Sequence, residues 1–320
     1  MNAVYLCLTL LLTFEGVAFG TTFTFINRCD FPVWPGILSG AGSPALETTG
    51  FELSVSGSRT VSAPSGWSGR FWGRSGCSFD GTGRGSCSTG DCGSGEVECN
   101  GGGAAPPATL VEFTLGKGSS KDFYDVSLVD GYNLPMIVEG TGGSGACEST
   151  GCVTDLNRKC PEELRAGGGV ACKSACEAFG SPEYCCSGEY NSPSSCKPSL
   201  YSQIFKAACP RSYSYAYDDA TSTFTCTGAD YTITFCPNSP SIKSARGTAS
   251  TPATPTNNNP GSLLSGTNPP IPVQQTSYAA NWLADLAFSG SRRNQPLTSV
   301  LLAFGFVATS SILLSFRQHL

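Results

Sequence analysis

The chain has 320 residues, of which 17 are cysteine, 39 glycine and 21 proline, and only 13% are charged. So many cysteines indicate an oxidising compartment and a framework of disulfides, because thiols stay reduced in the cytosol. The net charge of −5 argues against a nucleic-acid partner, which would require a basic surface. The single histidine is His319, so no Ser–His–Asp or Cys–His nucleophile and no histidine zinc site is expected in the body of the chain. Any hydrolytic chemistry would therefore depend on carboxylates.

The chain begins with an apolar run at 4–14 that is too short to span a membrane as a helix. Small residues then stand at positions −3 and −1 of a signal-peptidase site that would follow Gly20. We therefore expect residues 1–20 to be a signal peptide, with a buried N-terminal strand as the alternative. Cleavage there removes Cys7 and leaves 16 cysteines, an even number.

Residues 21–237 contain all 16 of these cysteines and are expected to form one folded module. The runs at 22–26 and 231–235 alternate polar and apolar residues, as half-buried strands do. Further strands are expected, in chain order, at 51–55, 70–73, 109–115 and 123–129, and short helices at 161–166, 172–179 and 200–208. Cysteines are sparse up to Cys77 and dense after it, which predicts a β-sandwich with loop-rich subdomains held by disulfides.

The charge of the chain is unevenly distributed. Residues 21–237 hold 14 Lys or Arg against 22 Asp or Glu, a net charge of −8, so the module is acidic. Residues 238–291 are rich in Ser, Thr, Pro and Asn. Such a composition cannot bury enough apolar surface to form a core, and it predicts an extended stalk.

A second apolar run at 297–316 has 20 residues, just enough to cross a membrane. Before it stand three small residues, Ser289, Gly290 and Ser291, and a polar spacer. Small triplet, spacer and apolar tail are the three parts of a signal for a glycosylphosphatidylinositol (GPI) anchor. We therefore expect 292–320 to be removed and the lipid to be attached to Ser289, or else to Gly290 or Ser291. The alternative is a single-pass transmembrane helix at 297–316.

The stretch GRGSCSTGDC at 83–92, continuing through Gly95 to Cys99, resembles the signature of the thaumatin-like (pathogenesis-related 5) proteins. The segments TFTFINRCDFPVWPG, GRFWGRSGCSFD, DFYDVSLVDGYNLPM and YAYDDATSTFTC fit the same family in one register. The resemblance covers the module, with all 16 family cysteines, and does not extend to the stalk or the tail. It implies a mainly β fold, a flattened β-sandwich with two small disulfide-rich subdomains of loops and short helices.

The resemblance also implies eight disulfides. Carried over in order, they are Cys29–Cys236, Cys77–Cys87, Cys92–Cys99, Cys147–Cys226, Cys152–Cys209, Cys160–Cys172, Cys176–Cys185 and Cys186–Cys196.

An acidic cleft lined by one Arg, one Glu and three Asp is a further implication of the resemblance. Matched by motif, its residues are Arg70, Glu112, Asp125, Asp130 and one of Asp218 and Asp219, of which we prefer Asp219. Clustered carboxylates resist simultaneous ionisation, so at least one pKa should be raised, while Arg70 can keep a neighbour ionised. One protonated and one ionised carboxylate are the minimum for glycoside hydrolysis. In an enzyme, Glu112 would be the general acid and Asp125 or Asp130 the nucleophile or base.

The function that these features predict is binding of fungal or cell-wall β-1,3-glucan, or another cell-wall polysaccharide, by an antifungal plant-defence protein. We expect it to be a monomer that is anchored by lipid at the outer face of the plasma membrane or lies in the cell wall, with no cofactor and no metal ion. A weak endo-β-1,3-glucanase and a protein-binding hydrolase inhibitor or receptor component remain alternatives, and the carboxylates could also only brace loops. Candidates for stacking on sugar rings are Phe71, Trp72, Tyr124 and Tyr132, although aromatic residues at strand spacing more often belong to the core.

Overall fold

The computed structural model describes residues 20–237. The expected signal peptide, apart from Gly20, lies outside these residues. So do the stalk, the GPI signal with its attachment residue Ser289, and the alternative transmembrane helix at 297–316. Among the helices of residues 20–237, none is long and apolar enough to cross a membrane.

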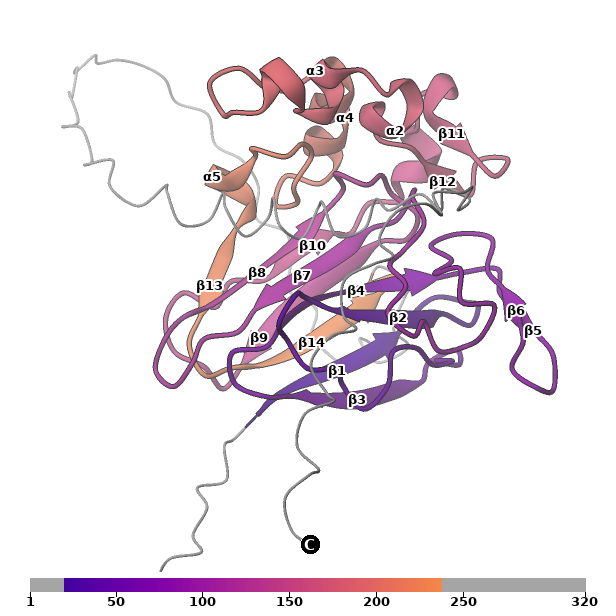
Figure 1. The fold of residues 1–320 in the computed structure, drawn as a ribbon, viewed down its shortest axis with the longest axis vertical. Helices are drawn as coiled ribbons and strands as arrows, with labels where there is room; N and C mark the ends of the chain where they lie inside the picture. Colours follow the sequence, from indigo (N-terminus) through magenta and orange to yellow (C-terminus); the bar gives the residue numbers. More distant parts are fainter. Residues whose placement is uncertain (1–19, 238–320) are drawn as a thin grey trace, which may run out of the picture. The chain divides into compact units, whose positions relative to one another are not determined.

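Two five-stranded sheets make up most of the regular structure (Figure 1). The first sheet has the order β10–β9–β14–β1–β3, with β1 (Thr21–Asn27), β3 (Ser58–Ala63), β9 (Met136–Thr141), β10 (Thr150–Cys152) and β14 (Asp230–Phe235). The second has the order β13–β8–β7–β4–β2, with β2 (Trp34–Ser39), β4 (Ser68–Arg74), β7 (Leu110–Thr114), β8 (Asp122–Ser127) and β13 (Phe224–Cys226). A short hairpin joins β5 (Ser78–Phe79) to β6 (Gly85–Ser86). The mainly β fold expected from the sequence is confirmed.

The first and last strands are neighbours in the first sheet, where indigo β1 lies beside orange β14 in Figure 1. They pair in parallel, from Phe23 opposite Tyr231 to Asn27 opposite Phe235. The Cys29–Cys236 disulfide, between residues 207 positions apart, follows directly after both strands.

Aromatic side chains fill the space between the two sheets. Because successive residues of a strand face opposite ways, β1 directs Phe23 and Phe25 inward, and both are fully buried. The ring of Phe23 lies 4.7 Å from that of Phe71 and 4.7 Å from that of Phe113. The four candidates for sugar stacking, Phe71, Trp72, Tyr124 and Tyr132, are each 0% exposed. They belong to the interior, so their proposed role at the surface is wrong.

Residues 51–55 do not form the expected strand. Leu53 makes an isolated bridge with Val33, and its carbonyl also accepts the side-chain amide of Asn27. Ser56 then adopts a φ of 60°, which turns the chain before the next strand. The apolar alternation of this segment therefore buries Phe51 and Leu53 without a strand ladder.

Short helices gather beyond one end of the sheets, at the top of Figure 1. They are η1 (Leu156–Lys159), η2 (Glu162–Leu164), α2 (Ala175–Phe179), α3 (Pro182–Cys185), η3 (Gly188–Tyr190) and α4 (Leu200–Ala208), with the strand pair β11 (Arg165–Ala166) and β12 (Ala171–Cys172) among them. We call residues 156–209 the helical subdomain. The helix expected at 200–208 is confirmed, whereas 161–166 holds only a single 3₁₀ turn before β11.

The helix expected at 172–179 begins later, at Ala175. The Ser174 hydroxyl accepts the backbone N–H of Glu177 and so satisfies a donor that a helix start leaves free. Cys172 belongs to β12 instead. The subdomain joins the sandwich through a second buried cluster that contains Leu128, Tyr132 and Phe205.

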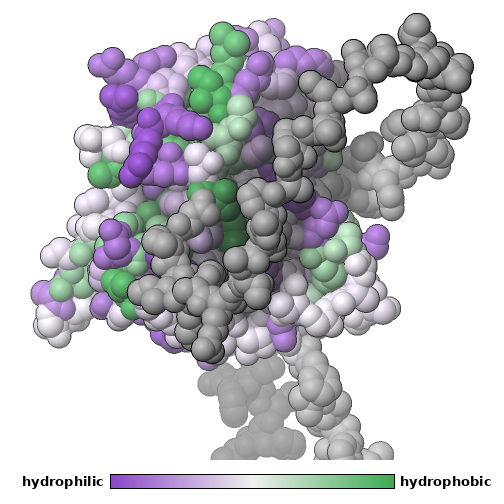
Figure 2. Space-filling model, turned by 180° about the vertical axis from the view of Figure 1, so that it is seen from behind, coloured by the Kyte–Doolittle hydropathy of each residue, from purple (hydrophilic) through white to green (hydrophobic). Residues whose placement is uncertain are grey.

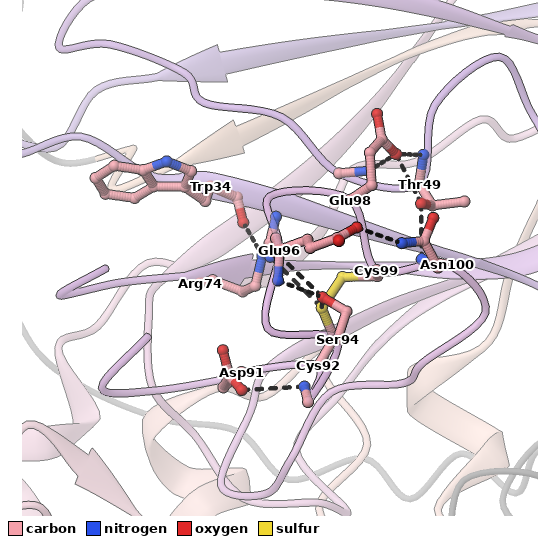
Figure 3. Close-up of a disulfide and its surroundings, with 12 residues drawn as sticks. Trp34, Thr49, Arg74, Asp91, Cys92, Ser94, Glu96, Glu98, Cys99 and Asn100 are labelled. Atoms are coloured by element: carbon pink, nitrogen blue, oxygen red, sulfur yellow. Dashed lines mark hydrogen bonds between the residues drawn. A yellow bond between two sulfur atoms is a disulfide. The ribbon is translucent and has the colours of Figure 1, made fainter. Parts of the chain in front are cut away.

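Eight disulfides are present, as expected, and they join the cysteines in the pairs given above. Figure 3 shows one of them, Cys92–Cys99, beside the fully buried Arg74. The guanidinium of Arg74 donates to the carbonyls of Trp34 at 3.0 Å and Val97 at 2.6 Å. Burial lowers the pKa of Arg74 to about 10. This side chain therefore connects the disulfide loop to the edge strand β2.

The surface seen from behind is mixed in polarity. Figure 2 shows strongly hydrophilic residues over the upper part of the molecule, where the helical subdomain lies, with small hydrophobic patches between them. Four large apolar side chains of the subdomain are exposed: Leu200 (77%), Val170 (50%), Phe179 (45%) and Ile204 (39%). Small exposed patches of this kind are normal for a folded protein.

Candidate functional site

Three charged residues stand in one row across the second sheet. Arg70 of β4 is directly opposite Glu112 of β7, and Glu112 is directly opposite Asp125 of β8. Opposite residues of antiparallel strands face the same side, with Cβ atoms about 4.5–5.5 Å apart. Since Phe71 and Phe113, next along their strands, point into the sandwich, this row lies on the face turned away from the first sheet.

The three residues are almost inaccessible to solvent. Arg70 is 4% exposed, Glu112 5% and Asp125 0%. Both carboxyl oxygens of Asp125 are buried, and no group within residues 20–237 donates a hydrogen bond to them. A buried carboxylate without donors is unfavourable, so this environment favours the neutral acid.

Asp130 and Asp219 complete the set that the sequence predicted, which we call the acidic cluster. Asp130 follows β8 and is partly exposed. Asp219 is the first residue of α5 (Asp219–Ser222), and one of its carboxyl oxygens accepts the Tyr213 hydroxyl at 2.8 Å. Tyr213 in turn bridges in parallel to Ser127, at the end of β8, which brings α5 toward the row.

The neighbouring Asp218 has a different environment. Its carboxylate forms an ion pair with Lys206 of α4 at 2.9 Å and accepts the backbone N–H and hydroxyl of Ser214. The charge of Asp219, by contrast, is close enough to Asp125 to raise its pKa. Of the two aspartates, Asp219 is thus the one beside the row.

Burial dominates the electrostatics of the cluster. It raises the pKa of Glu112 to about 7, a shift that the Arg70 charge opposes and the Asp130 charge increases. Burial, followed by the charges of Glu112 and Asp219, raises the pKa of Asp125 well above its usual range. Burial raises the pKa of Asp130 above its ordinary value, and the Arg70 charge opposes part of this shift. Near neutral pH the cluster therefore combines protonated and ionised carboxyls, which can donate and accept hydrogen bonds respectively.

Comparison with known proteins identifies the family. The sequence profile of the Thaumatin family matches residues 27–237. The chain belongs to this family. It is 70% identical over 228 residues to "Thaumatin-like protein 1" of Arabidopsis thaliana, covering 69% of this chain and 88% of that protein. It is 59% identical over 222 residues to "Pathogenesis-related thaumatin-like protein 3.5" of Cryptomeria japonica, covering 68% and 91%. It is also 52% identical over 239 residues to "Glucan endo-1,3-beta-glucosidase" of Prunus avium, covering 73% and 98%.

In this thaumatin-family protein, sequence reasoning missed three residues around the acidic cluster. Tyr213 contacts Asp219, while Lys173 and Glu177 come from the helical subdomain and lie within electrostatic reach of each other. Burial raises the pKa of Glu177 to about 7, with Lys173 opposing the shift and Asp130 adding to it. The i, i+4 spacing of Lys173 and Glu177 was the available signal, but it indicates only a helix-surface pair.

Metal coordination has no candidate in the part of the chain that the structure describes. Within residues 20–237, no three His, Cys, Asp or Glu side chains are grouped so that they could hold a metal ion. A pocket of about 220 Å³ among the loops 87–91, 105–107 and 166–171 is not lined by any residue of the acidic cluster. Its one acidic residue, Asp91, accepts the backbone N–H groups of Cys87 and Gly93, so its carboxylate supports the turn.

Proposed function

We propose that this protein binds β-1,3-glucan through the acidic cluster, as an extracellular protein of plant defence. The observation that carries the proposal is the row of Arg70, Glu112 and Asp125, in which burial keeps carboxyls protonated beside a fixed cation. Sugar hydroxyls both donate and accept hydrogen bonds, so a mixed set of acids and carboxylates suits them. The relative named glucan endo-1,3-beta-glucosidase supports β-1,3-glucan as the ligand class.

Binding without efficient turnover is the form of this function that the burial favours. Asp125 is fully buried with a raised pKa, so it is a poor ionised nucleophile near neutral pH. The pKa of about 7 for Glu112 suits a general acid, and it favours weak β-1,3-glucanase activity as the second candidate. In that case Asp130, which is partly exposed and lies within electrostatic reach of Arg70, would be the base.

One experiment separates these functions. The protein and its Glu112→Gln variant are incubated with insoluble β-1,3-glucan to measure binding, and with laminarin to measure released reducing ends. We expect the wild type to be retained on the glucan and to release no more reducing ends than the variant. Release by the wild type that the variant lacks would establish the enzyme. If the wild type binds neither insoluble β-1,3-glucan nor laminarin, the proposal is rejected.

We also propose that the module, residues 21–237, is tethered to the outer face of the plasma membrane. The proposal rests on the Ser289–Ser291 triplet and the apolar tail after it, with the stalk between module and lipid. Phosphatidylinositol-specific phospholipase C should release the protein from membranes of cells that express the full chain. Retention, with a known GPI-anchored protein released in the same sample, would favour the transmembrane helix at 297–316.

A further inference from the structure

Two charged residues of the helical subdomain lie next to the acidic cluster without belonging to it. Lys173 directly follows β12, and Glu177 lies in the first turn of α2. The charge of Asp130, which follows β8, is close enough to Glu177 to raise its pKa. Charged groups from the sandwich and from the subdomain therefore lie within electrostatic reach of each other here.

Main-chain pairing holds the segment that carries Asp130 close to the segment that carries Lys173. Tyr132 and Cys172 exchange two backbone hydrogen bonds of 2.8 Å each, so the segment after Asp130 is joined to the segment before Lys173. Gly131 has a φ of 88°, and a Cβ at this position would lie 2.7 Å from the Cys172 carbonyl oxygen. Glycine is thus the residue that permits so close an approach.

The side chain of Glu177 is not used by its own helix. Its backbone N–H is bonded to Ser174, but its carboxyl oxygen Oε2 is buried and has no hydrogen-bond partner among residues 20–237. A Glu at the third position of a helix often bonds back to the N-cap residue, and this oxygen does not. A buried acceptor without a partner is unfavourable, so a ligand hydroxyl that reached this oxygen would gain a favourable hydrogen bond.

Accessibility favours Glu177 over the residues of the central row. Arg70, Glu112 and Asp125 are at most 5% exposed, so the accessible members of the acidic cluster are Asp130 and Asp219. Asp130 and Glu177 are both partly exposed. A sugar unit placed over Asp130 would therefore come within reach of Glu177.

We propose that Glu177 is a ligand-contacting residue, which accepts a hydrogen bond from a hydroxyl of a glucan unit held over Asp130. This inference rests on the proposed glucan binding and adds to it a contact from the helical subdomain. The charge of Lys173 acts on Glu177 and favours the ionised, accepting form of its carboxylate.

The test is calorimetric titration with laminarin of the wild type, Glu177→Ala, Glu177→Gln and the control Glu189→Gln. Glu189 is an exposed glutamate of the same subdomain, so its variant makes the same charge change elsewhere. Losing the contact in Glu177→Ala should raise Kd about tenfold. Glu177→Gln keeps an acceptor and should raise it less than about threefold. The control should bind like the wild type.

A second measurement uses the wild type alone, in case a variant misfolds. The carbon-13 shift of the Glu177 carboxyl is followed during the laminarin titration, and it should change and saturate at the calorimetric Kd. If the wild type binds laminarin while Glu177→Ala binds equally well and the shift stays constant, the role of Glu177 is refuted and glucan binding stands. If the wild type binds neither laminarin nor insoluble β-1,3-glucan, both proposals are refuted.

Discussion

Glu112 and Asp125 face each other across β7 and β8, and neither is more than 5% exposed. Two carboxyls so close in a dry environment cannot both carry a charge at low cost. Glu112 also faces Arg70, whereas Asp125 has no hydrogen-bond donor within the described residues. Asp125 is therefore the carboxyl that stays protonated to the higher pH. The coupled titration of the two groups has a consequence for stability.

The free energy of unfolding should fall as the pH rises from about 4.5 to about 7. The pKa of Glu112 is raised from 4.5 to about 7, so over this window the folded state holds a proton that the unfolded state has released. Below the window both states are protonated and the stability is fully present; above it, about 3 kcal/mol is lost through Glu112. Denaturant unfolding from pH 4 to 8 measures this. Glu112→Gln should lose that slope, and a wild-type profile no steeper than the variant's would contradict the prediction.

Arg74 should be a major contributor to stability, although it lies outside the acidic cluster. Replacing it with methionine leaves the carbonyls of Trp34 and Val97 without their buried donor, which should cost about 3 kcal/mol. Arg74→Lys keeps the charge but not the forked geometry and should recover only part of the loss. Both values come from guanidinium unfolding. A loss below 1 kcal/mol in Arg74→Met would show that the loop is held by its disulfide alone.

The ion pair between Lys206 and Asp218 should be energetically coupled. The two side chains are 24% and 14% exposed, and Lys206 also donates to the Ser212 carbonyl and the Ser222 hydroxyl. In a double-mutant cycle with Lys206→Met and Asp218→Asn, we expect a coupling energy of about 1–2 kcal/mol. The exposed pair Arg211–Glu148 serves as comparison and should give less than about 1 kcal/mol. Equal coupling energies in the two pairs would contradict the expectation that the more buried pair is the more strongly coupled.

The Cys29–Cys236 disulfide should contribute more than the short-range bridges. It closes a loop over a sequence separation of 207, against 10 for Cys77–Cys87. Loop-closure entropy gives about 5 kcal/mol for the long loop, and replacing both cysteines with alanine should cost most of it. Alanine at Cys77 and Cys87 is the matched comparison, measured by denaturant unfolding, and should cost less. The reverse order would show that local strain, not chain entropy, decides these stabilities.

Much of the fold follows from local patterns in the sequence. The alternation at 22–26 and 231–235 predicts two strands, because one face of each is buried. Their parallel pairing could not be predicted, since no local pattern specifies a partner so distant in the chain. Strand β2 was missed because it contains Pro35 and Gly36, which usually interrupt strands. A Cβ on Gly36 would lie 2.4 Å from the Trp72 ring, so packing requires glycine there.

For the acidic cluster, the sequence predicts which residues belong to it but not how they are arranged. The family motifs named Arg70, Glu112 and Asp125, but only the strand register shows that they are direct neighbours. Glu177 escaped notice because its place depends on the pairing of Tyr132 with Cys172, between segments about 40 residues apart. Side chains brought to a site by such long-range pairing leave no periodic signal in the sequence.

The parallel arrangement of β1 and β14 determines how the module would respond to mechanical force. The chain enters at the start of β1 and leaves at the end of β14, so tension between these points shears the two strands lengthwise and loads their hydrogen bonds together. If the strands slipped, the Cys29–Cys236 bond would carry the load directly and shield the 206 residues between the two cysteines. Only the few residues before Cys29 would then extend, by about 3.5 Å each.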